Sequence, residues 1–346
     1  MYKNSLGDQK TSELSRDWRL WVAENALRKC DKVSMAQTMI QAGVDESVAK
    51  AGIDAVMSDP IFEAALKHQQ ITFKYASVME NYHQLLLQNP DYDQIDRRKQ
   101  LSKSEFLEKY YLGNKPVVIT DFAKNWPALS RWTPRYFKET YGDVQVEAQI
   151  GRNKDPHYEL NKANHRCYFT MSDFIDRVEA LDNSNDIYLT ANNDALRAKE
   201  FKSLFNDIGP LPDYMNPDML ENESSLWIGP GGTITPLHHD SVHLFHVQIM
   251  GRKRWRFIHP MQIPRMYNFN GYFSPIDIDA PDLARFPLFK DVKILDVTVG
   301  PGEAVFLPLA WWHHVVSLDI CISVSLANIA YRNLFEYDNP SNTNWY

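Results

Sequence analysis

The stretch GTITPLHHDSVHLFHVQIMGRKRWRF, from Gly232 to Phe257, decides the fold and reads as a pair of β-strands. It holds four histidines within nine positions, together with one aspartate and one lysine. Single histidines are common in strands, but four so close together beside an aspartate are unusual. Some of these side chains carry chemistry and others only fill space, and the two-residue repeat of a strand helps to separate them.

The direction of Lys253 follows from this repeat. Residues two apart share one face of a strand, so Lys253 lies on the side of Trp255 and Phe257. Arg256 lies with two other arginines on the opposite side. The side with two aromatic residues is the core side, where an unpaired ammonium group is costly. Lys253 therefore needs an anion, which is either an Asp or Glu in an internal salt bridge or the carboxylate of a small ligand.

The same spacing makes His238 and Asp240 candidate metal ligands. Their side chains project to one face of a strand because they are two residues apart, while His239 points the other way. A His-x-Asp pair supplies two of the three ligands in the 2-His-1-carboxylate triad of non-haem Fe(II) oxygenases. The segment GEAVFLPLAWWHHVVSL contains the required distal histidine, as His313 or His314. Adjacent side chains diverge, so at most one of this pair should bind metal, and the alternative for either is a hydrogen-bonded structural histidine.

The next strand, ICISVSLA, alternates between two kinds of side chain. One face is apolar, whereas the other carries Cys321, Ser323 and Ser325. A strand with a small and polar inner face lines a cavity better than it fills a core. We therefore expect this strand to border a binding pocket.

Composition limits the class of protein. The chain has 346 residues and a formal charge of −7, which argues against a nucleic-acid partner because phosphate binding needs a concentrated basic face. Three cysteines without a CxxC pair predict neither a disulfide framework nor a zinc finger, and they favour a reducing, cytoplasmic location. The N-terminus is polar and no run of roughly 20 apolar residues occurs, so we expect no signal peptide and no membrane span.

The apolar pattern divides the chain in two. Residues 1–100 read as helices without any metal-binding or nucleophilic cluster, and we expect them to pack on the rest of the protein or on a second subunit in a homodimer. Residues 101–346 mix helices with strands up to Ser224. After that point they consist almost entirely of short strands, which is typical of a β-barrel or sandwich. The expected fold class is therefore α+β.

Three motifs together resemble a known family. TPLHHD, the lysine of GRKRWRF, and GEAVFLPLAWWHHVVSL occur in the order and spacing of the JmjC family of Fe(II)- and 2-oxoglutarate-dependent oxygenases. Within it, the chain is similar to the cupin-like hydroxylase branch, which includes the asparaginyl hydroxylase factor inhibiting HIF. The similarity covers residues 101–330 and includes KPVVITDFAKNWPA and DIYLTANN. The resemblance implies a double-stranded β-helix, or jelly-roll, core that uses Fe(II), 2-oxoglutarate and O₂.

The resemblance also implies which residues bind the metal. His238 and Asp240 match the ligands of the HxD motif, and His313 matches the distal histidine. His314 is then a structural neighbour of the site. The two histidines that follow Asp240 in the opening stretch, at positions 243 and 246, are either ligand contacts or core residues.

The cosubstrate positions match less completely. Lys253 matches the lysine that pairs with the distal carboxylate of 2-oxoglutarate, and Thr235 and Tyr188 match its hydroxyl partners. Ser325 stands where the asparaginyl hydroxylase has a cosubstrate-binding asparagine, and Leu244 stands where relatives often have another. These two departures affect the expected geometry or affinity for the cosubstrate.

The resemblance implies an enzyme that hydroxylates a C–H bond, with a peptide or protein side chain as the expected substrate. Histone demethylation is disfavoured because the chain lacks reader fingers. A small molecule or a modified nucleoside is the alternative substrate. A catalytically impaired cupin-type scaffold, which the Leu244 departure motivates, and a zinc-binding cupin are the rival functions. The complete triad and Lys253 argue for the oxygenase.

Two polar segments without regular periodicity are candidates for the walls of a substrate groove. They span residues 151–170 and 268–287, and long irregular segments in compact domains are usually functional or disordered. The second combines aromatic and acidic residues, including Tyr272, Phe273 and Asp279, which suit an extended peptide and would repel a polynucleotide. The alternative is that both segments are ordinary surface loops over a small-molecule pocket.

Overall fold

The computed structural model describes residues 13–181, 183–191, 193–268 and 271–335. The chain divides into two compact units, Met1–Tyr82 and His83–Tyr346, whereas the sequence suggested a boundary near residue 100. The difference arises at β1 (Asp96–Arg98), which pairs in parallel with β2 (Val117–Ile119) of the second unit. Three polar residues show no strand-like alternation, so this strand depends on its neighbour. Residues 1–12 of the expected helical region lie outside the described residues.

The first unit consists of helices around a small apolar core. Three of its helices are α1 (Arg16–Leu27), α2 (Lys32–Gln41) and α3 (Glu46–Met57). Each begins after a Ser or Asp whose side chain accepts a backbone hydrogen bond from the first turn, which satisfies a donor that the helix leaves free. The fourth helix, α4 (Pro60–Leu86), continues into the second unit. The most deeply buried residues of this core are Val22, Met39, Ala49 and Ile53.

In the second unit, helical segments surround the strands. The α- and π-helical segments are α5 (Lys103–Glu105), Phe106–Tyr111, α6 (Ala128–Arg131), α7 (Pro134–Tyr141), α8 (Lys162–His165) and α9 (Met171–Glu179). The 3-10 segments are Arg152–Lys154, Ala195–Arg197, Lys199–Asp207, Pro217–Met219, Pro260–Arg265 and Pro287–Asp291. Helix α7 shows how the sequence sets such an element: Thr133 caps it and Pro134 opens it.

Three sheets form the β-structure. The six-stranded sheet has the order β1-β2-β11-β8-β13-β6 and adds β6 (Ser224–Gly229), β8 (Leu244–Met250), β11 (Ala304–Leu307) and β13 (Cys321–Leu326). The four-stranded sheet has the order β10-β9-β12-β7, with β7 (Ile234–His238), β9 (Lys253–Ile258), β10 (Leu295–Val299) and β12 (Trp312–Ser317). The small sheet β4-β3-β5 contains β3 (Gln145–Ile150), β4 (Arg166–Thr170) and β5 (Ile187–Tyr188).

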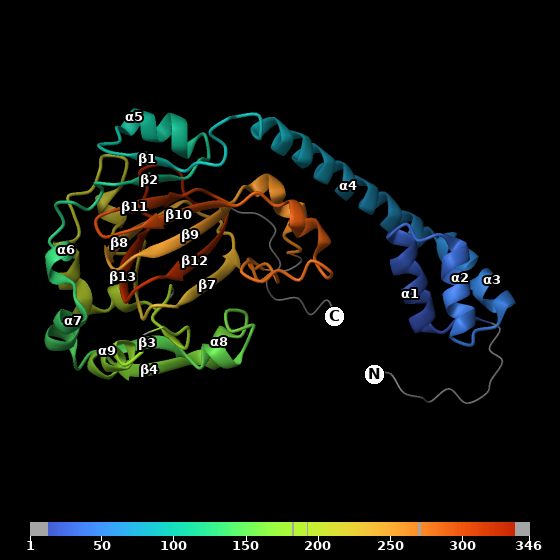
Figure 1. Ribbon diagram of the computed structural model, residues 1–346, viewed down its shortest axis with the longest axis horizontal. Coiled ribbons are helices and arrows are strands. Elements are labelled where there is room, and N and C mark those ends of the chain that lie inside the picture. The colour runs from blue at the N-terminus through green and yellow to red at the C-terminus, as the bar shows by residue number, and fades with distance from the viewer. Residues whose placement is uncertain (1–12, 182, 192, 269–270, 336–346) are drawn as a thin grey trace. The chain divides into compact units, whose positions relative to one another are not determined.

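The two larger sheets are the layers of a jelly-roll, shown in Figure 1 with α5, α6 and α7 around them. Successive residues of β11 show both sides of the six-stranded sheet. Phe306 joins the core shared with the helices, whereas Val305 and Leu307 join the core shared with Trp255 and Phe257 of the four-stranded sheet. This architecture confirms the expected α+β class with a cupin-like, double-stranded β-helix core.

Two further features bear on the sequence expectations. None of the described helices combines the length and apolar character needed to cross a membrane. The three cysteines are free, with Cys30 exposed, Cys167 half-buried and Cys321 buried.

Candidate metal and cosubstrate site

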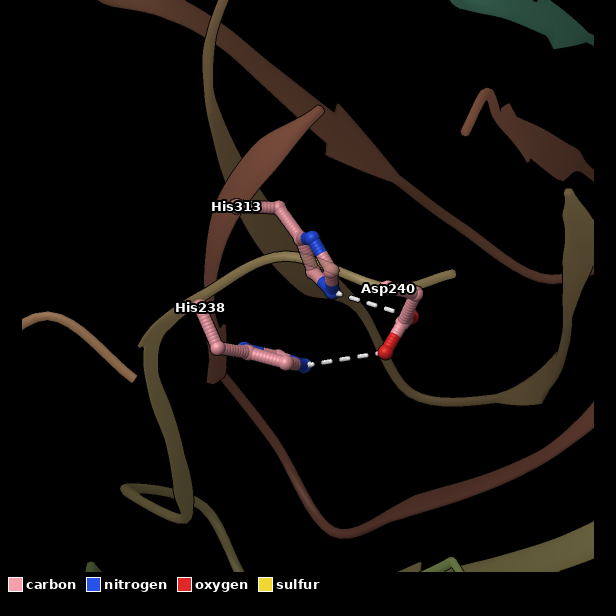
Figure 2. Close-up of side chains that lie close together, drawn as sticks. All are labelled: His238, Asp240 and His313. Atoms are coloured by element: carbon pink, nitrogen blue, oxygen red, sulfur yellow. Dashed lines mark ion pairs between the residues drawn. The ribbon is translucent and has the colours of Figure 1, made fainter. Parts of the chain in front are cut away.

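Two neighbouring strands bring the expected metal ligands together. His238 ends β7 and faces His313 of β12 in the strand register, and Asp240 follows β7 by two residues. Nε2 of His238 lies 4.0 Å from Oδ1 of Asp240, and Nε2 of His313 lies 3.7 Å from Oδ2 of the same carboxylate (Figure 2). One potential ligand atom from each residue falls within 4.8 Å of the others. No other His, Cys, Asp and Glu residues of the described chain converge in this way.

The second nitrogen of each histidine is held by the backbone. Nδ1 of His238 lies 2.7 Å from the carbonyl oxygen of Pro236, and Nδ1 of His313 lies 3.0 Å from that of Trp311. A carbonyl oxygen can only accept, so each Nδ1 carries the proton and each Nε2 presents a lone pair. Such a contact fixes the tautomer and the direction of a metal-binding imidazole.

Seclusion within a cavity disfavours charge on these side chains. Burial lowers the pKa of the His313 ring well below its ordinary value, and His238 lowers it further. Burial raises the pKa of the Asp240 carboxyl, against the opposing effect of His238. The Asp240 side chain is 30% exposed and lines the cavity.

This donor set fits a divalent transition metal. Two imidazole nitrogens and one carboxylate are the ligands of the facial triad, which keeps other coordination positions open. Metal–ligand bonds of about 2.0–2.2 Å allow donors up to roughly 4 Å apart to share one ion. The N···O distances of 4.0 and 3.7 Å meet that limit. An ion there would also supply the cation that a secluded carboxylate needs.

Lys253 lines the same cavity, which has a volume of about 450 Å³, and its offset along β9 from the triad defines what we call the lysine end. It is four residues along β9 from Phe257, the partner of His313 in the strand register, and strands rise by about 3.3 Å per residue. Its ammonium lies 3.0 Å from the hydroxyl of Tyr188 and 3.0 Å from that of Ser323.

The charge of Lys253 has only neutral partners. The side chain is 1% exposed, and no carboxylate of the described residues lies within ion-pair distance of its Nζ. Of the two alternatives that the sequence left open, the internal salt bridge is therefore wrong for the described part of the chain. A buried ammonium that lines a cavity without a counterion fits an anionic ligand.

The other expected cosubstrate residues form no hydrogen bond with Lys253 in the described part of the chain. Thr235 of β7 and Ser325 of β13 both line the cavity. The hydroxyl of Ser325 accepts a hydrogen bond from the indole Nε1 of Trp227 at 3.0 Å. Trp227 in turn lies 5.5 Å from the Lys253 ammonium, measured to the ring centroid, so Ser325 orients an aromatic neighbour of the lysine.

His246 belongs to the cavity. Its Nε2 lies 3.3 Å from the Lys253 ammonium, and its ring contacts Trp227 and Trp255 edge-on. The ammonium can only donate, so Nε2 accepts and the ring is neutral. Burial and then Lys253 lower its pKa well below the ordinary value. Leu244, two residues earlier on β8, also lines the cavity.

Two other histidines of the opening stretch are structural. Nδ1 of His243 accepts a hydrogen bond from the Leu309 amide at 3.0 Å, and its ring stacks on Phe306. Burial lowers its pKa to about 4. The ring of His239 packs edge-on against Trp312 with 4.5 Å between centroids, and burial lowers its pKa to about 4 as well.

Arg256 departs from the expectation for its strand face. Alternation placed it opposite the core, yet it is only 7% exposed because the segment after β9 covers it. Its guanidinium lies 2.7 Å from Oδ1 of Asp279 and 3.0 Å from Nδ1 of His314. Burial, followed by Arg256, lowers the pKa of His314 to about 4. His314 is therefore tied to a structural arginine, beside the ligand His313.

Two residues that contact the site were not predicted from the sequence. Ser323 binds the Lys253 ammonium, and its position on the small polar face of ICISVSLA was the available signal. The ring of Phe273 stacks on His238 with 5.2 Å between centroids. No spacing rule links residues 35 positions apart, so that contact was not accessible to strand periodicity.

The two expected groove segments are only partly irregular. The end of the first forms β4, which pairs with β3, while Glu159 and Lys162 from its middle line the cavity. In the second, Tyr272 and Phe273 line the cavity, whereas Asp279 is paired with an arginine. Residues 269–270 of that segment lie outside the described residues. Both segments thus contribute a few side chains to the cavity.

Comparison with known proteins agrees with this architecture. A family model described as a cupin-like domain matches residues 103–336. Lysine-specific demethylase 8 of Xenopus tropicalis is 30% identical over 232 residues, covering 65% of this chain and 50% of that protein. Lysine-specific demethylase JMJ30 of Arabidopsis thaliana is 31% identical over 242 residues (67% and 54%), and JmjC domain-containing protein D of Dictyostelium discoideum is 30% identical over 249 residues (64% and 53%). The chain spans about half the length of these curated relatives. It belongs to the cupin-like family of JmjC-domain proteins, which confirms the resemblance of its motifs.

Proposed function

We propose that this protein is an Fe(II)- and 2-oxoglutarate-dependent oxygenase that hydroxylates a C–H bond on a polypeptide side chain. The observation that carries the proposal is the pairing of two sites in one cavity. A candidate metal triad lies at one end, and the buried Lys253 without a counterion lies at the other. A dicarboxylate cosubstrate that binds a metal through one end and an ammonium through the other matches this combination.

At the metal end, the chain supplies oriented donors. His238 and His313 present Nε2 because their Nδ1 atoms are bound to backbone carbonyls, and Asp240 supplies the carboxylate. Fe(II) bound there would supply the redox chemistry that couples oxidative decarboxylation of 2-oxoglutarate to oxygenation of a substrate. Phe273, stacked on His238, restricts the motion of that ring.

At the lysine end, the chain binds and orients the cosubstrate. Lys253 provides the charge for the distal carboxylate, while Tyr188 and Ser323 hold the ammonium in place from two sides. His246 accepts from the same ammonium, and this requires a neutral imidazole. The cation is thus pre-positioned, so little reorganisation is needed when an anion arrives.

A polypeptide substrate is supported by the cavity lining and by the relatives. Tyr272 and Phe273 offer aromatic surface near His238, and the cavity also reaches Glu159 and Lys162, which can pair with either sign of charge. Two relatives are named as lysine-specific demethylases, so their names refer to an amino-acid side chain. A small molecule or a modified nucleoside is the alternative substrate for the same chemistry.

Those names also favour a second candidate, removal of methyl groups from lysine. Hydroxylation of an N-methyl C–H bond gives a carbinolamine, which breaks down to the amine and formaldehyde. The two candidates therefore differ in product: stable oxygen on the substrate in one case, and formaldehyde in the other.

The test begins without a substrate. The purified chain is supplied with Fe(II), 2-oxoglutarate and O₂, and succinate is measured alongside bound metal. Succinate formation that requires Fe(II) supports the oxygenase. Tight binding of zinc without succinate would favour a non-oxygenase cupin, and cosubstrate binding without turnover would favour an impaired scaffold.

A second experiment identifies the substrate class. The enzyme is incubated with host proteins, peptides and metabolites under labelled oxygen, and formaldehyde is measured in parallel. Label retained in a peptide supports hydroxylation, while formaldehyde with loss of a methyl group supports demethylation. Label found only in small metabolites or nucleosides would overturn the polypeptide substrate and leave the oxygenase proposal intact.

A further inference from the structure

The long helix α4 has two apolar stripes, and only one is packed within the first unit. Phe62 and Leu66 contribute to the core of that unit. Five of the large apolar residues further along the helix share one face and are each between 46% and 64% exposed. These residues, which we call the outer stripe, are Ile71, Tyr75, Val78, Tyr82 and Leu85.

The outer stripe faces away from the packed one. An α-helix turns by about 100° per residue, so residues nine positions apart lie on opposite sides. Ile71 follows Phe62 by nine positions, and Tyr75 follows Leu66 by nine. Helices α1, α2 and α3 share a core with Phe62 and Leu66, and therefore leave uncovered the four members of the outer stripe that belong to the first unit, from Ile71 to Tyr82.

The spacing of the outer stripe is that of a coiled-coil seam. Its members are separated alternately by four and three residues, an average of 3.5. An ordinary amphipathic helix follows a 3.6-residue period, whereas a 3.5-residue period keeps a narrow seam aligned along a partner helix. Polar and exposed residues flank one side of the seam, including Lys74 and Asn81, as at the rim of an interface.

The exposed area is close to what a stable dimer requires. Aromatic side chains bury on the order of 150–250 Å² each, so five large side chains about half exposed present several hundred Å² per chain. Two such stripes would bury on the order of 1,000 Å² before flanking residues are counted, and stable interfaces begin at about 1,200 Å². Contiguous apolar surface of this size on a monomer usually marks an interaction site.

We infer that the outer stripe of α4 pairs with the outer stripe of a second copy of this chain, so that the protein is a homodimer joined by a two-helix coiled coil. A second copy necessarily presents the same 3.5-residue period, which is the property a partner for this seam must have. Two-fold homodimers are also the commonest oligomers. This assembly is independent of the proposed chemistry, since the stripe contains none of the cavity residues.

The test measures the mass of the full chain by light scattering at micromolar concentration. The wild type should have about twice the 40.2 kDa of one chain. The double variant Tyr75→Glu/Val78→Glu places charges in the seam and should shift the mass to that of one chain, with unchanged helical circular dichroism. Ser77→Glu adds the same charge on another face of the helix and should remain dimeric.

A cross-linking experiment covers the case in which the double variant folds poorly. In a Cys30→Ser background, because Cys30 is exposed, Val78→Cys should give covalent dimers with a short bis-maleimide, and the yield should fall on addition of Tyr75→Glu. A wild type that is monomeric at high micromolar concentration would overturn the inference, even if another protein were found to bind the stripe. A folded double variant that remains dimeric would also overturn it.

Discussion

The two ends of the cavity differ in the charge that they leave uncompensated. The triad end offers two lone pairs and a carboxylate, whereas the lysine end offers an ammonium surrounded by neutral groups. Arg256, a third buried charge in the same sheet, differs from both because Asp279 compensates it. Buried charges without a partner are costly, so a fold retains them where a ligand completes them. Arg256 is therefore structural, because Asp279 balances its charge. The two ends of the cavity carry groups whose charge a bound ligand would balance.

The largest effect is expected when one of the metal-binding side chains at the triad end is removed. His238→Ala or Asp240→Ala should abolish succinate formation, a larger loss than the 10–100-fold typical of substitutions at residues that only hydrogen-bond to metal ligands. The fold should survive because these side chains line a cavity and not a packed core. Succinate assays, metal analysis and thermal unfolding of the metal-free variants are the measurements.

His239→Gln is the matched control in the same motif. His239 packs against Trp312 on the other side of the strand, so this variant should keep its metal and its turnover even if it is less stable. Full succinate production by either ligand variant would show that the triad assignment is wrong.

At the lysine end, Lys253→Met should change affinity and stability in opposite directions. Loss of one member of a buried charge pair costs about 3–5 kcal/mol, so 2-oxoglutarate should bind about two to four orders of magnitude more weakly. The cosubstrate-free protein should be at least as stable as the wild type, because an uncompensated buried charge is gone. Calorimetric titration and thermal unfolding test both halves, with the exposed Lys290→Met as the control. Unchanged affinity would assign Lys253 a purely structural role.

Short-range spacing predicted three of the candidate site residues, His238, Asp240 and Lys253, whereas the choice of His313 over His314 came from the family resemblance. His238 and Lys253 lie on strands whose alternation is visible in the sequence, Asp240 follows the first of these strands by two residues, and the inward direction of Lys253 agrees with its burial. The fold class followed from the same alternation, repeated in many short strands. Both inferences use only the geometry of one strand at a time.

Features created by tertiary contact were not visible in this way. Arg256 is buried by a covering segment, and Phe273 reaches His238 from that same segment. The strand β1 exists because β2 pairs with it, although its three polar residues carry no strand signal. Strand alternation places Ser323 and Ser325 on one face and does not distinguish the serine that contacts the lysine from the serine whose hydroxyl is bound to Trp227.

His243 is a useful third case, because it lies in the same stretch of sequence as His238 but belongs to neither the triad nor the lysine end of the cavity. Its pKa is lowered to about 4 by burial, from an ordinary value near 6.5, so the unfolded chain binds the additional proton. The stability that a neutral His243 contributes is therefore present above pH 6.5 and is lost as the pH falls toward 4. That loss is on the order of 3 kcal/mol in the free energy of unfolding.

The measurement is the pH dependence of unfolding for the wild type and His243→Gln. The variant should be less stable at neutral pH, because the Leu309 amide loses its acceptor geometry, but it should lose less stability on acidification. Parallel stability curves for the two proteins between pH 7 and 4 would contradict the prediction.

The smallest expected changes in 2-oxoglutarate affinity come from two hydroxyl groups: that of Tyr188, which contacts Lys253, and that of Ser325, which is linked to it only through Trp227. Tyr188→Phe removes a hydroxyl 3.0 Å from the ammonium, and a hydrogen bond to a charged group is worth about 1.5–3 kcal/mol. Affinity for 2-oxoglutarate should therefore fall by about one to two orders of magnitude, less than in Lys253→Met. Ser325→Ala removes a hydroxyl that binds the neutral indole of Trp227, where about 0.5–1.5 kcal/mol is typical, and its effect reaches the cosubstrate only through that ring. Calorimetry on both variants should rank Tyr188→Phe above Ser325→Ala. The reverse order would mean that Ser325 binds the cosubstrate directly and that the hydroxyl of Tyr188 only packs beside the lysine.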